Sequence, residues 1–553
     1  MKRLWKADLG NGIYQNPILF ADYSDPDVIR VGDVYYMTAS SFNYIPGLPI
    51  LTSKDLVNWK LVNYALDCIE DENYDTPQHA KGVWAPAIRF HEGELYIYYG
   101  MPDEGIFMVK TREALAKWEK PVLVLAGKGL IDPCPFWDED GHAYIVHGYA
   151  KSRIGFKSFL GIFPMSYDGT KAIGEDHILY NGLETQPTIE GPKVYKRDGY
   201  YYIFAPAGSV KTGWQTVLRG KSIYGPFEEK IVLKQGCTEV NGPHQGALVD
   251  TINGDEWFIH FQDRGMYGRI VHMQPVNWVD GWPVMGENAV DYCGQPVMTY
   301  HKPNVDAAGS KQDSLAVKES LRADAEVGYY LEASDNFDSD KLNLMWQWLG
   351  NPKDDFYSLT EREGFLRLYC KNPSENENPI LWDHANVLTQ KLVCPYFTAE
   401  SCLHVKGLRE AEQAGMVMMG GDYAYLGVRM INGVKTMLLS VSSDKKDGAI
   451  RANGQSSDKE EKITILAELS PEQEKVYFVF EIKEQEGNPV FVMKYSLDGK
   501  EYVIVPVDFM PSDHTWVGAK IGLFATVCAC RTLSEQAKNM GYGDFEYIKV
   551  ETK

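Results

Sequence analysis

The first 290 residues repeat one pattern five times, and this repeat restricts the fold more than any other feature of the chain. Each copy reads as a polar opening, an apolar strand, a turn with Gly or Asp, and an aromatic strand. The copies are "DPDVIRVGDVYYMTAS", "WAPAIRFHEGELYIYYG", "DPCPFWDEDGHAYIVHG", "EGPKVYKRDGYYYIFAPAG" and "HQGALVDTINGDEWFIHFQ", with openings 59, 48, 58 and 54 residues apart. Two further strands are predicted after each copy, and their pattern is weakest after the third copy. The fold class is therefore all-β, and residues 1–300 are predicted to form a five-bladed β-propeller rather than a generic sandwich.

The openings of the five copies carry unusual chemistry. The innermost strand of each propeller blade runs along the central axis, so the openings should meet at one end of it. They are Asp25, Trp84, Asp132, Glu190 and His244. Clustered carboxylates raise one another's pKa at a cost in stability, and a structural repeat does not need them. We therefore expect a functional site, with Asp22 capping the turn beside Asp25 and Asp27 facing solvent.

Composition restricts the partners. The net charge of −21 argues against a nucleic acid or an anionic membrane, because binding either requires a basic face. Aromatic residues make up 12% of the chain, which suits β-strands and also suits faces that stack on sugar rings. A neutral substrate fits the net charge better than a nucleic acid or a membrane does, and a homo-oligomer is left open. Nine cysteines without a CxxC pair and an N-terminus without an apolar h-region favour a cytoplasmic location.

A pair of carboxyl groups beside aromatic side chains is typical of the active sites of glycoside hydrolases. One carboxyl must be protonated to protonate the leaving oxygen, and the other must be ionised. A third carboxylate near the acid would hold up the pKa of that acid. The distance between the pair separates inverting from retaining enzymes, roughly 6.5–9.5 Å against 5–5.5 Å, and sequence does not supply it.

At these residues the chain resembles glycoside hydrolase family 43, in its two-domain β-xylosidase and α-L-arabinofuranosidase branch. The matching segments include "YSDPDVIRVGDVYYMTASSFNYIPGLPILTSKDLVNWKLV", "GVWAPAIRF", "IDPCPFWDEDGHAYIVHG", "TIEGPKVYKRDGYYYIF" and "GPHQGALVD". The resemblance implies exo-acting, inverting hydrolysis of plant-derived, xylan-type oligosaccharides. By motif, it implies that Asp25 is the general base, Glu190 the general acid, and Asp132 the residue that raises the pKa of the acid and orients it.

The resemblance also implies residues that bind the sugar. Trp84, in "VWAP", resembles the active-site aromatic of the family. Phe42 and Tyr44 belong to a loop that resembles the lining of the terminal-sugar pocket. Of the two, we favour Phe42 as the residue that contacts the sugar. Arg269, in "GMYGRI", matches an arginine that reaches sugar hydroxyls, and we favour it over Arg264. Without the resemblance, the two aromatic side chains Trp84 and Phe42 would be read as core.

His244, in "GPHQG", resembles the axial histidine of the family, which meets a central metal ion directly or through water. A single His without ligand partners in the sequence would otherwise be read as a satisfied core residue. We expect no cofactor for the chemistry, because the carboxyls supply acid and base. A calcium ion at the axis would be structural.

A second domain follows a change in the sequence. Residues 301–330 are polar and predict a linker. Residues 331–553 alternate polar and apolar positions between turn residues, which predicts a β-sandwich. The segment "DNFDSDKLNLMWQWLGNPKDDFYSLTEREGFLRLY" resembles the concanavalin-like domain attached to this branch. The resemblance implies a mainly structural role and an aromatic residue lent to the pocket, which sequence alone does not identify.

Two other functions fit the same fold. Invertase-like fructosidases also join a propeller to a sandwich and retain configuration, but their "NDPNG" and "RDP" motifs are absent here. A non-catalytic sugar-binding protein would not need all three carboxyls. The sequence leaves open the choice between xylose and arabinofuranose, because both pentoses present similar shapes.

Overall fold

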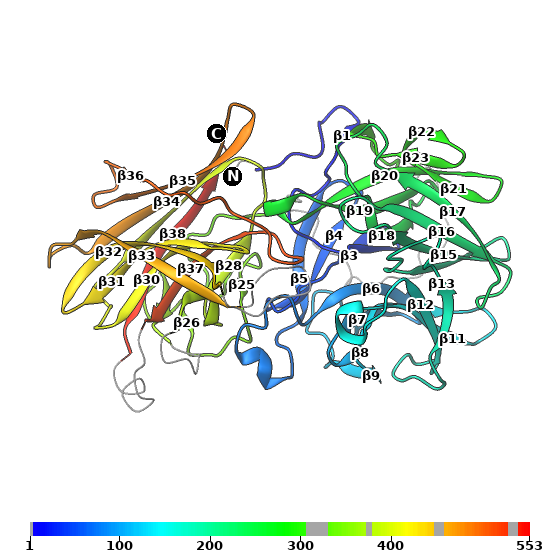
Figure 1. Cartoon of the computed structure of the whole chain (residues 1–553), viewed down its shortest axis with the longest axis horizontal. Helices are drawn as coiled ribbons and strands as arrows, with labels where there is room; N and C mark the ends of the chain where they lie inside the picture. The colour runs from blue at the N-terminus through cyan, green and yellow to red at the C-terminus, as the bar shows by residue number, and fades with distance from the viewer. Residues whose placement is uncertain (1–3, 306–329, 372–378, 447–457, 529–539, 553) are drawn as a thin grey trace.

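The computed structural model describes residues 4–305, 330–371, 379–446, 458–528 and 540–552. Two β-sheet domains lie side by side in Figure 1, the N-terminal one in blue to green and the C-terminal one in yellow to red. Most of the predicted linker, residues 306–329, lies outside the described residues. Within the described ranges, no helix has the length and hydropathy to span a bilayer.

The N-terminal domain is a five-bladed β-propeller, which confirms the fold class predicted from the repeat. Each blade is an antiparallel sheet of four consecutive strands. The blades are β2–β5 (Asp27–Val31, Val34–Thr38, Gly47–Ser53, Trp59–Leu66), β6–β9 (Trp84–His91, Glu94–Met101, Gly105–Thr111, Val122–Ala126), β10–β13 (Leu130–Trp137, Ala143–Tyr149, Phe159–Met165, His177–Asn181), β14–β17 (Lys193–Arg197, Tyr200–Ala207, Trp214–Gly220, Phe227–Lys234) and β18–β21 (His244–Asp250, Glu256–Asp263, Arg269–Val279, Trp282–Met285). The fourth sheet is extended by β22 (Glu287–Val290) and β23 (Cys293–Gln295).

The ring is closed by contact between its first and last blades. The innermost strands β18 and β2 are neighbours, as are β2 and β6. The segment before β2 is fastened to the last blade, since Leu19 forms a β-bridge with Val271 of β20. Earlier in this segment, β1 (Ile13–Gln15) pairs with β24 (Thr299–His301). The Asn16 amide donates to the carbonyls of Met273 and Val297 at 2.8 Å each.

A residue with left-handed backbone lies at or near the start of each innermost strand, and these residues change the alignment of the copies. The φ angle is +56° at Asp25, +24° at Ala85, +56° at Asp132, +57° at Gly191 and +39° at Gln245. A proline follows in four copies and a glycine in the fifth. Aligned on this turn, Asp25 and Asp132 share one position, and Trp84, Glu190 and His244 occupy the position before it. The prediction that all five openings are equivalent is therefore wrong by one residue, and the side chains form two adjacent tiers.

The C-terminal domain is a sandwich of two seven-stranded sheets. One contains β25 (Gln347–Trp348), β28 (Leu388–Lys391), β37 (Lys520–Val527), β30 (Glu412–Met419), β31 (Ala424–Ile431), β32 (Val434–Asp444) and β33 (Lys459–Glu468). The other contains β26 (Tyr357–Ser358), β27 (Leu366–Tyr369), β38 (Tyr542–Glu551), β29 (Phe397–His404), β34 (Lys475–Gln485), β35 (Asn488–Ser496) and β36 (Val503–Val505). Apolar side chains such as Leu403, Met416 and Phe478 fill the core.

The two domains share a buried interface on the side of blade 1. Phe42 and Tyr44 pack in one hydrophobic cluster with Leu349 of the C-terminal domain. The backbones of Ile45 and Trp348 exchange two hydrogen bonds of 3.1 and 2.6 Å. The loop after β3 is therefore part of the domain interface.

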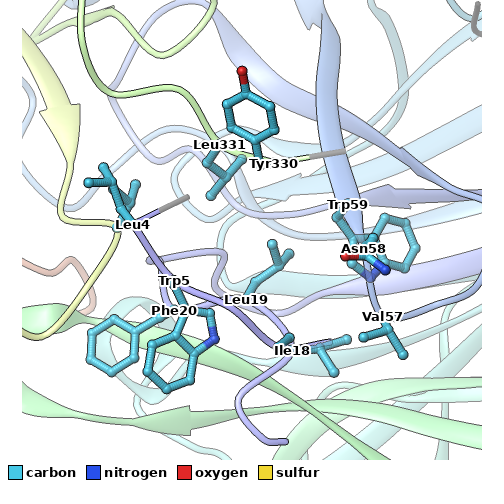
Figure 2. Close-up of a pocket in the computed structure, with 12 residues that line it drawn as sticks. Leu4, Trp5, Ile18, Leu19, Phe20, Val57, Asn58, Trp59, Tyr330 and Leu331 are labelled. Atoms are coloured by element: carbon cyan, nitrogen blue, oxygen red, sulfur yellow. The ribbon is translucent and has the colours of Figure 1, made fainter. Parts of the chain in front are cut away.

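A second junction contains an apolar pocket, shown in Figure 2. Trp5, Ile18 and Trp59 come from the propeller side, and Leu331 and Val393 from the C-terminal domain. Its lining contains none of the residues predicted for the site. We therefore assign it no function.

Candidate active site

The three predicted carboxyls lie together at one end of the propeller axis. Asp25 precedes β2, Asp132 lies in β10, and Glu190 precedes β14. The backbone N–H of Gly191 donates to Asp132 Oδ2 at 2.8 Å, which links Asp132 to the segment that carries Glu190. The charge of Asp25 acts on Asp132, and that of Asp132 on Glu190. The structure thus brings three blades together in one carboxyl site.

Asp25 is surrounded by hydrogen-bond donors. Its Oδ2 accepts from the hydroxyls of Ser24 at 2.8 Å and Ser40 at 2.6 Å. Its Oδ1 accepts from Arg269 Nη1 at 3.0 Å. Ser40 is fixed in turn, because its Oγ accepts from the N–H of Ala85 at 2.7 Å. These three donors fix the orientation of both carboxyl oxygens of Asp25, as a positioned general base requires.

Glu190 has the opposite environment. Burial and, after it, the negative charge of Asp132 together raise the pKa of Glu190 to about 8. Burial and the charge of Asp25 raise the pKa of Asp132 to about 6, against the Gly191 N–H, which lowers it. The Glu190 side chain is still 32% exposed, so one edge can reach a substrate. A carboxyl held protonated near neutral pH is the form that a general acid needs.

His244 lies beside Glu190 but does not bond to it. Its Nε2 is 3.6 Å from Glu190 Oε1, which is beyond hydrogen-bond distance. Burial lowers the pKa of His244 to about 3, and the positive charge of Arg269 also lowers it. Neither ring nitrogen has a hydrogen-bond partner among the described residues. A neutral, buried imidazole with an unused lone pair fits a ligand of an axial cation.

Arg269, not Arg264, contacts the carboxyls. The guanidinium of Arg269 donates to Ser24 Oγ at 2.7 Å and to Asp25 at 3.0 Å, and the residue is 7% exposed. It lies over the ring of Phe261 at 4.5 Å. Arg264 is exposed and pairs with Glu239 at 3.5 Å. The structure thus separates the two candidates that the sequence left in competition.

Two tryptophans from different domains wall the site. The rings of Trp84 and Trp516 are 6.3 Å apart and nearly perpendicular. The Arg269 guanidinium lies 5.4 Å from the Trp516 ring, and that of Arg153 lies 5.2 Å from the Trp84 ring. Both tryptophans are half-buried. Trp516 belongs to the C-terminal domain, so this domain contributes an aromatic wall to the site.

Phe42 and Tyr44 are placed differently from Trp84. They are 4% and 7% exposed, and both pack in the interface cluster with Leu349. Phe42 also exchanges backbone hydrogen bonds with Val83, directly before Trp84. Its position supports the loop beneath Trp84, and a direct sugar contact from Phe42 stays a prediction.

Trp516 is the site residue that sequence reasoning missed. It lies in the loop "SDHTWVGAK" ahead of β37, where no periodic pattern places it. Its signal was a large aromatic side chain in a polar loop followed by a glycine. That signal becomes informative only once the C-terminal domain is docked on the propeller.

The expectations for Asp22 and Asp27 are wrong. Asp27 is fully buried, and its Oδ2 accepts from the Ile88 N–H and from Arg89 Nη1 at 2.7 Å each. It faces the neighbouring blade because β2 is the innermost strand of a packed ring. The side chain of Asp22 bonds outside its own turn, since it accepts hydrogen bonds from the backbone N–H groups of Arg269 and of Gly518 in the other domain.

Cys402, His404 and Glu546 form a group of metal-ligand type far from the carboxyls, on the second sheet of the sandwich. Lys475 donates to Glu546 at 3.0 Å, and Arg362 contacts His404 Nδ1 at 3.2 Å. Burial raises the pKa of Cys402 to about 12. Two cations and a protonated thiol do not suit a metal ion, and we assign none there.

A protonated carboxyl facing a carboxylate rich in donors, with aromatic walls beside them, is what cleavage of a glycosidic bond requires. Fold and site together define a glycoside hydrolase of the propeller-plus-sandwich class. The chain belongs to the glycosyl hydrolases family 43, whose model matches residues 14–283. The beta xylosidase C-terminal concanavalin A-like domain matches residues 334–551, which confirms the predicted family branch.

Individual relatives agree with this placement. A beta-xylosidase of Formosa agariphila is 32% identical, over 94% of this chain and 88% of its own. The non-reducing end alpha-L-arabinofuranosidase BoGH43B of Bacteroides ovatus is 29% identical over 76% of each chain. Among solved structures, the bifunctional GH43-CE protein of Bacteroides eggerthii is 27% identical with a TM-score of 0.76. That match covers 98% of this chain and 64% of the other.

Proposed function

We propose that this glycosidase is exo-acting and inverting, and that it releases terminal β-D-xylose, α-L-arabinofuranose or both from xylan-type oligosaccharides. The observation that carries the proposal is the contrast between Glu190, whose pKa burial raises to about 8, and Asp25, which accepts three hydrogen bonds. The names of the relatives support the two sugars. The wall that Trp516 adds supports a pocket for one terminal sugar rather than an open groove.

In the proposed reaction, Glu190 gives its proton to the glycosidic oxygen as the bond to the anomeric carbon breaks. Asp25 takes a proton from a water molecule, whose oxygen attacks the anomeric carbon from the opposite face. Asp132 keeps Glu190 protonated between turnovers. Arg269 holds Asp25 in place and offers its remaining N–H groups to sugar hydroxyls. The configuration at the anomeric carbon inverts, and exchange with solvent restores both carboxyls.

Glu190→Gln tests the acid. We expect turnover of xylobiose to fall by roughly 10²–10⁴-fold, because its leaving group needs a proton. A dinitrophenyl xyloside, whose leaving group needs none, should lose far less. Glu184→Gln, at an exposed position six residues earlier, is the matched control and should resemble the wild type. Equal losses on both substrates would contradict the role of Glu190, and NMR detection of a retained first anomer would contradict inversion.

We also propose that His244 is the protein ligand of a structural calcium ion at the axis. Its buried, neutral ring with two unbonded nitrogens supports this, and waters would complete the oxygen shell that calcium prefers. When bound, the ion would add positive charge beside the carboxyl site, while acid and base remain carboxyls. A calcium-dependent rise in Tm that His244→Ala abolishes is the expected result. A Tm that does not respond to calcium would refute it.

A location inside the cell remains our proposal. Its support is that the buried cysteines Cys134, Cys394 and Cys402 are free thiols, as in proteins of reducing compartments. Fractionation of the source cells tests it, and recovery outside the cytoplasm would contradict it.

A further inference from the structure

Asp22 joins the two domains at the active site. The residue is 4% exposed and lies three positions before Asp25. Its Oδ1 accepts from the backbone N–H of Arg269 at 2.9 Å. Its Oδ2 accepts from the backbone N–H of Gly518 at 2.9 Å. One carboxylate therefore bonds the arginine that contacts Asp25 and the loop that carries Trp516.

The backbones around Asp22 approach so closely that neither side can shift alone. A Cβ on Gly268 would lie 2.4 Å from Asp22 Cγ, and a Cβ on Gly518 would lie 2.5 Å from the Gly268 nitrogen. The N–H of Ala519 donates to the carbonyl of Met266 at 2.7 Å. Only glycines fit at these two positions. The seam between the domains is thus closed directly behind Arg269.

Two buried lysines of the C-terminal domain lie within electrostatic reach of Asp22. Lys391 and Lys520 are 6% and 1% exposed, and the charge of Asp22 acts on both. Their Nζ atoms lie over the rings of Tyr23 at 5.1 Å and Tyr44 at 4.4 Å. Buried charges are costly without partners. Burial lowers the pKa of both lysines and the charge of Asp22 only opposes that shift, so the hydrogen bonds of Asp22 are what hold the seam.

We propose that Asp22 is a positioning residue that couples docking of the C-terminal domain to the alignment of Arg269 on Asp25. The inference rests on the proposed roles of Asp25 and Arg269. Asp22 fixes the backbone of Arg269 directly, and it fixes Trp516, on the other side of the same guanidinium, through Gly518. Loss of Asp22 removes both restraints at once. The base then loses the partner that orients it, although no residue in contact with sugar has been changed.

The test compares Asp22→Ala and Asp22→Asn with Asn351→Ala. Asn351 is the matched control because its amide also joins the domains, bonding Ile69 at 2.9 and 2.8 Å, away from the carboxyls. With aryl xyloside and aryl arabinofuranoside, we expect Asp22→Ala to lower kcat by roughly 10²-fold, the effect of a small misplacement at a reacting centre. Asp22→Asn, which still accepts one of the two hydrogen bonds, should fall between. Asn351→Ala should lower Tm and leave kcat unchanged.

Wild-type kcat in folded Asp22→Ala, or an equal loss of kcat in Asn351→Ala, would overturn the inference. If Asp22→Ala does not fold, Gly518→Ala perturbs the same seam from the other domain, and wild-type kcat there would overturn it too. Asp25→Asn separates this inference from the function on which it rests. Full activity in Asp25→Asn refutes the proposed base. An inactive Asp25→Asn together with unaffected Asp22 variants refutes only the positioning role.

Discussion

Glu190 and Asp25 belong to one site, and their surroundings differ. Glu190 loses hydration and faces Asp132, whose charge opposes ionisation. Its near neighbour His244 is neutral, because burial lowers the pKa of that ring to about 3. Asp25 faces Arg269 and two serine hydroxyls. The division between acid and base is therefore set by neighbouring residues rather than by the type of side chain.

At this scale we predict the effect of Asp132→Asn on the pH profile. Activity should decline as pH rises through the pKa of Glu190, about 8, because the acid loses its proton. Removing the charge of Asp132 lowers that pKa, so the basic limb of kcat/KM should move to lower pH by about one unit. The exposed Asp140→Asn serves as control. A limb that stays in place or moves to higher pH would contradict the coupling.

The first strand of each blade begins at a turn that the chain can form only with left-handed backbone. Asp25 and Asp132 adopt φ of +56° despite carrying side chains. Such residues cost about 1–3 kcal/mol and persist where the surrounding structure fixes them. The equivalent residue in the fourth blade is Gly191, whose N–H holds Asp132. The turn thus sets the positions of both the base and the residue beside the acid.

Gly191→Ala tests this element, with Gly199→Ala as a matched control. Both residues have left-handed backbone, so each alanine should cost about 1–2 kcal/mol in the free energy of unfolding. A Cβ at Gly199 meets nothing within 4 Å, whereas at Gly191 it lies 2.6 Å from Gln245 Cδ. We expect kcat/KM to fall only in Gly191→Ala, because its N–H must shift from Asp132. Denaturant unfolding and kinetics measure the two effects, and equal behaviour of the two variants would refute the argument.

On the scale of the whole molecule, the propeller supplies the acid and base and the sandwich supplies one wall. Trp516 reaches Arg269 and Trp84 across the domain interface. The sandwich therefore belongs to the substrate site and does not act only as a support. This arrangement agrees with the expectation that the domain lends an aromatic residue to the pocket, and Trp516 is the candidate for that residue.

Trp516→Ala should raise KM for aryl xyloside roughly tenfold, since a lost aromatic contact costs about 1 kcal/mol or more. Trp516→Phe should recover most of the affinity. Trp278→Ala removes a tryptophan from the outer part of blade 5, over Arg197, and should leave KM unchanged. Steady-state kinetics of the three variants measure the change in KM, and their Tm values show whether each variant is folded. An unchanged KM in Trp516→Ala would remove Trp516 from the site.

The local sequence pattern predicted the fold and the three carboxyls, because strand alternation and the Asp-Pro turns can both be recognised within short segments of the chain. The contacts that complete the site are not local. Arg269 meets Asp25 across 244 positions, and Gly518 meets Asp22 across 496. No spacing in the sequence encodes such pairs, which explains why Trp516 and the role of Asp22 were missed. The alignment error of one residue arose because the copies were matched on their polar openings instead of on the turn that follows.

The closure of the ring between its first and last blades has a consequence for how the protein matures. Asp25 leaves the ribosome long before Arg269, and β2 has no neighbour on one side until β18 has been made. Pairings this distant in sequence form late, because the entropy of closing the long loop must be paid first. Catalytic competence is thus among the last properties the chain acquires. A partly folded molecule would carry finished blades and still be inert as a glycosidase.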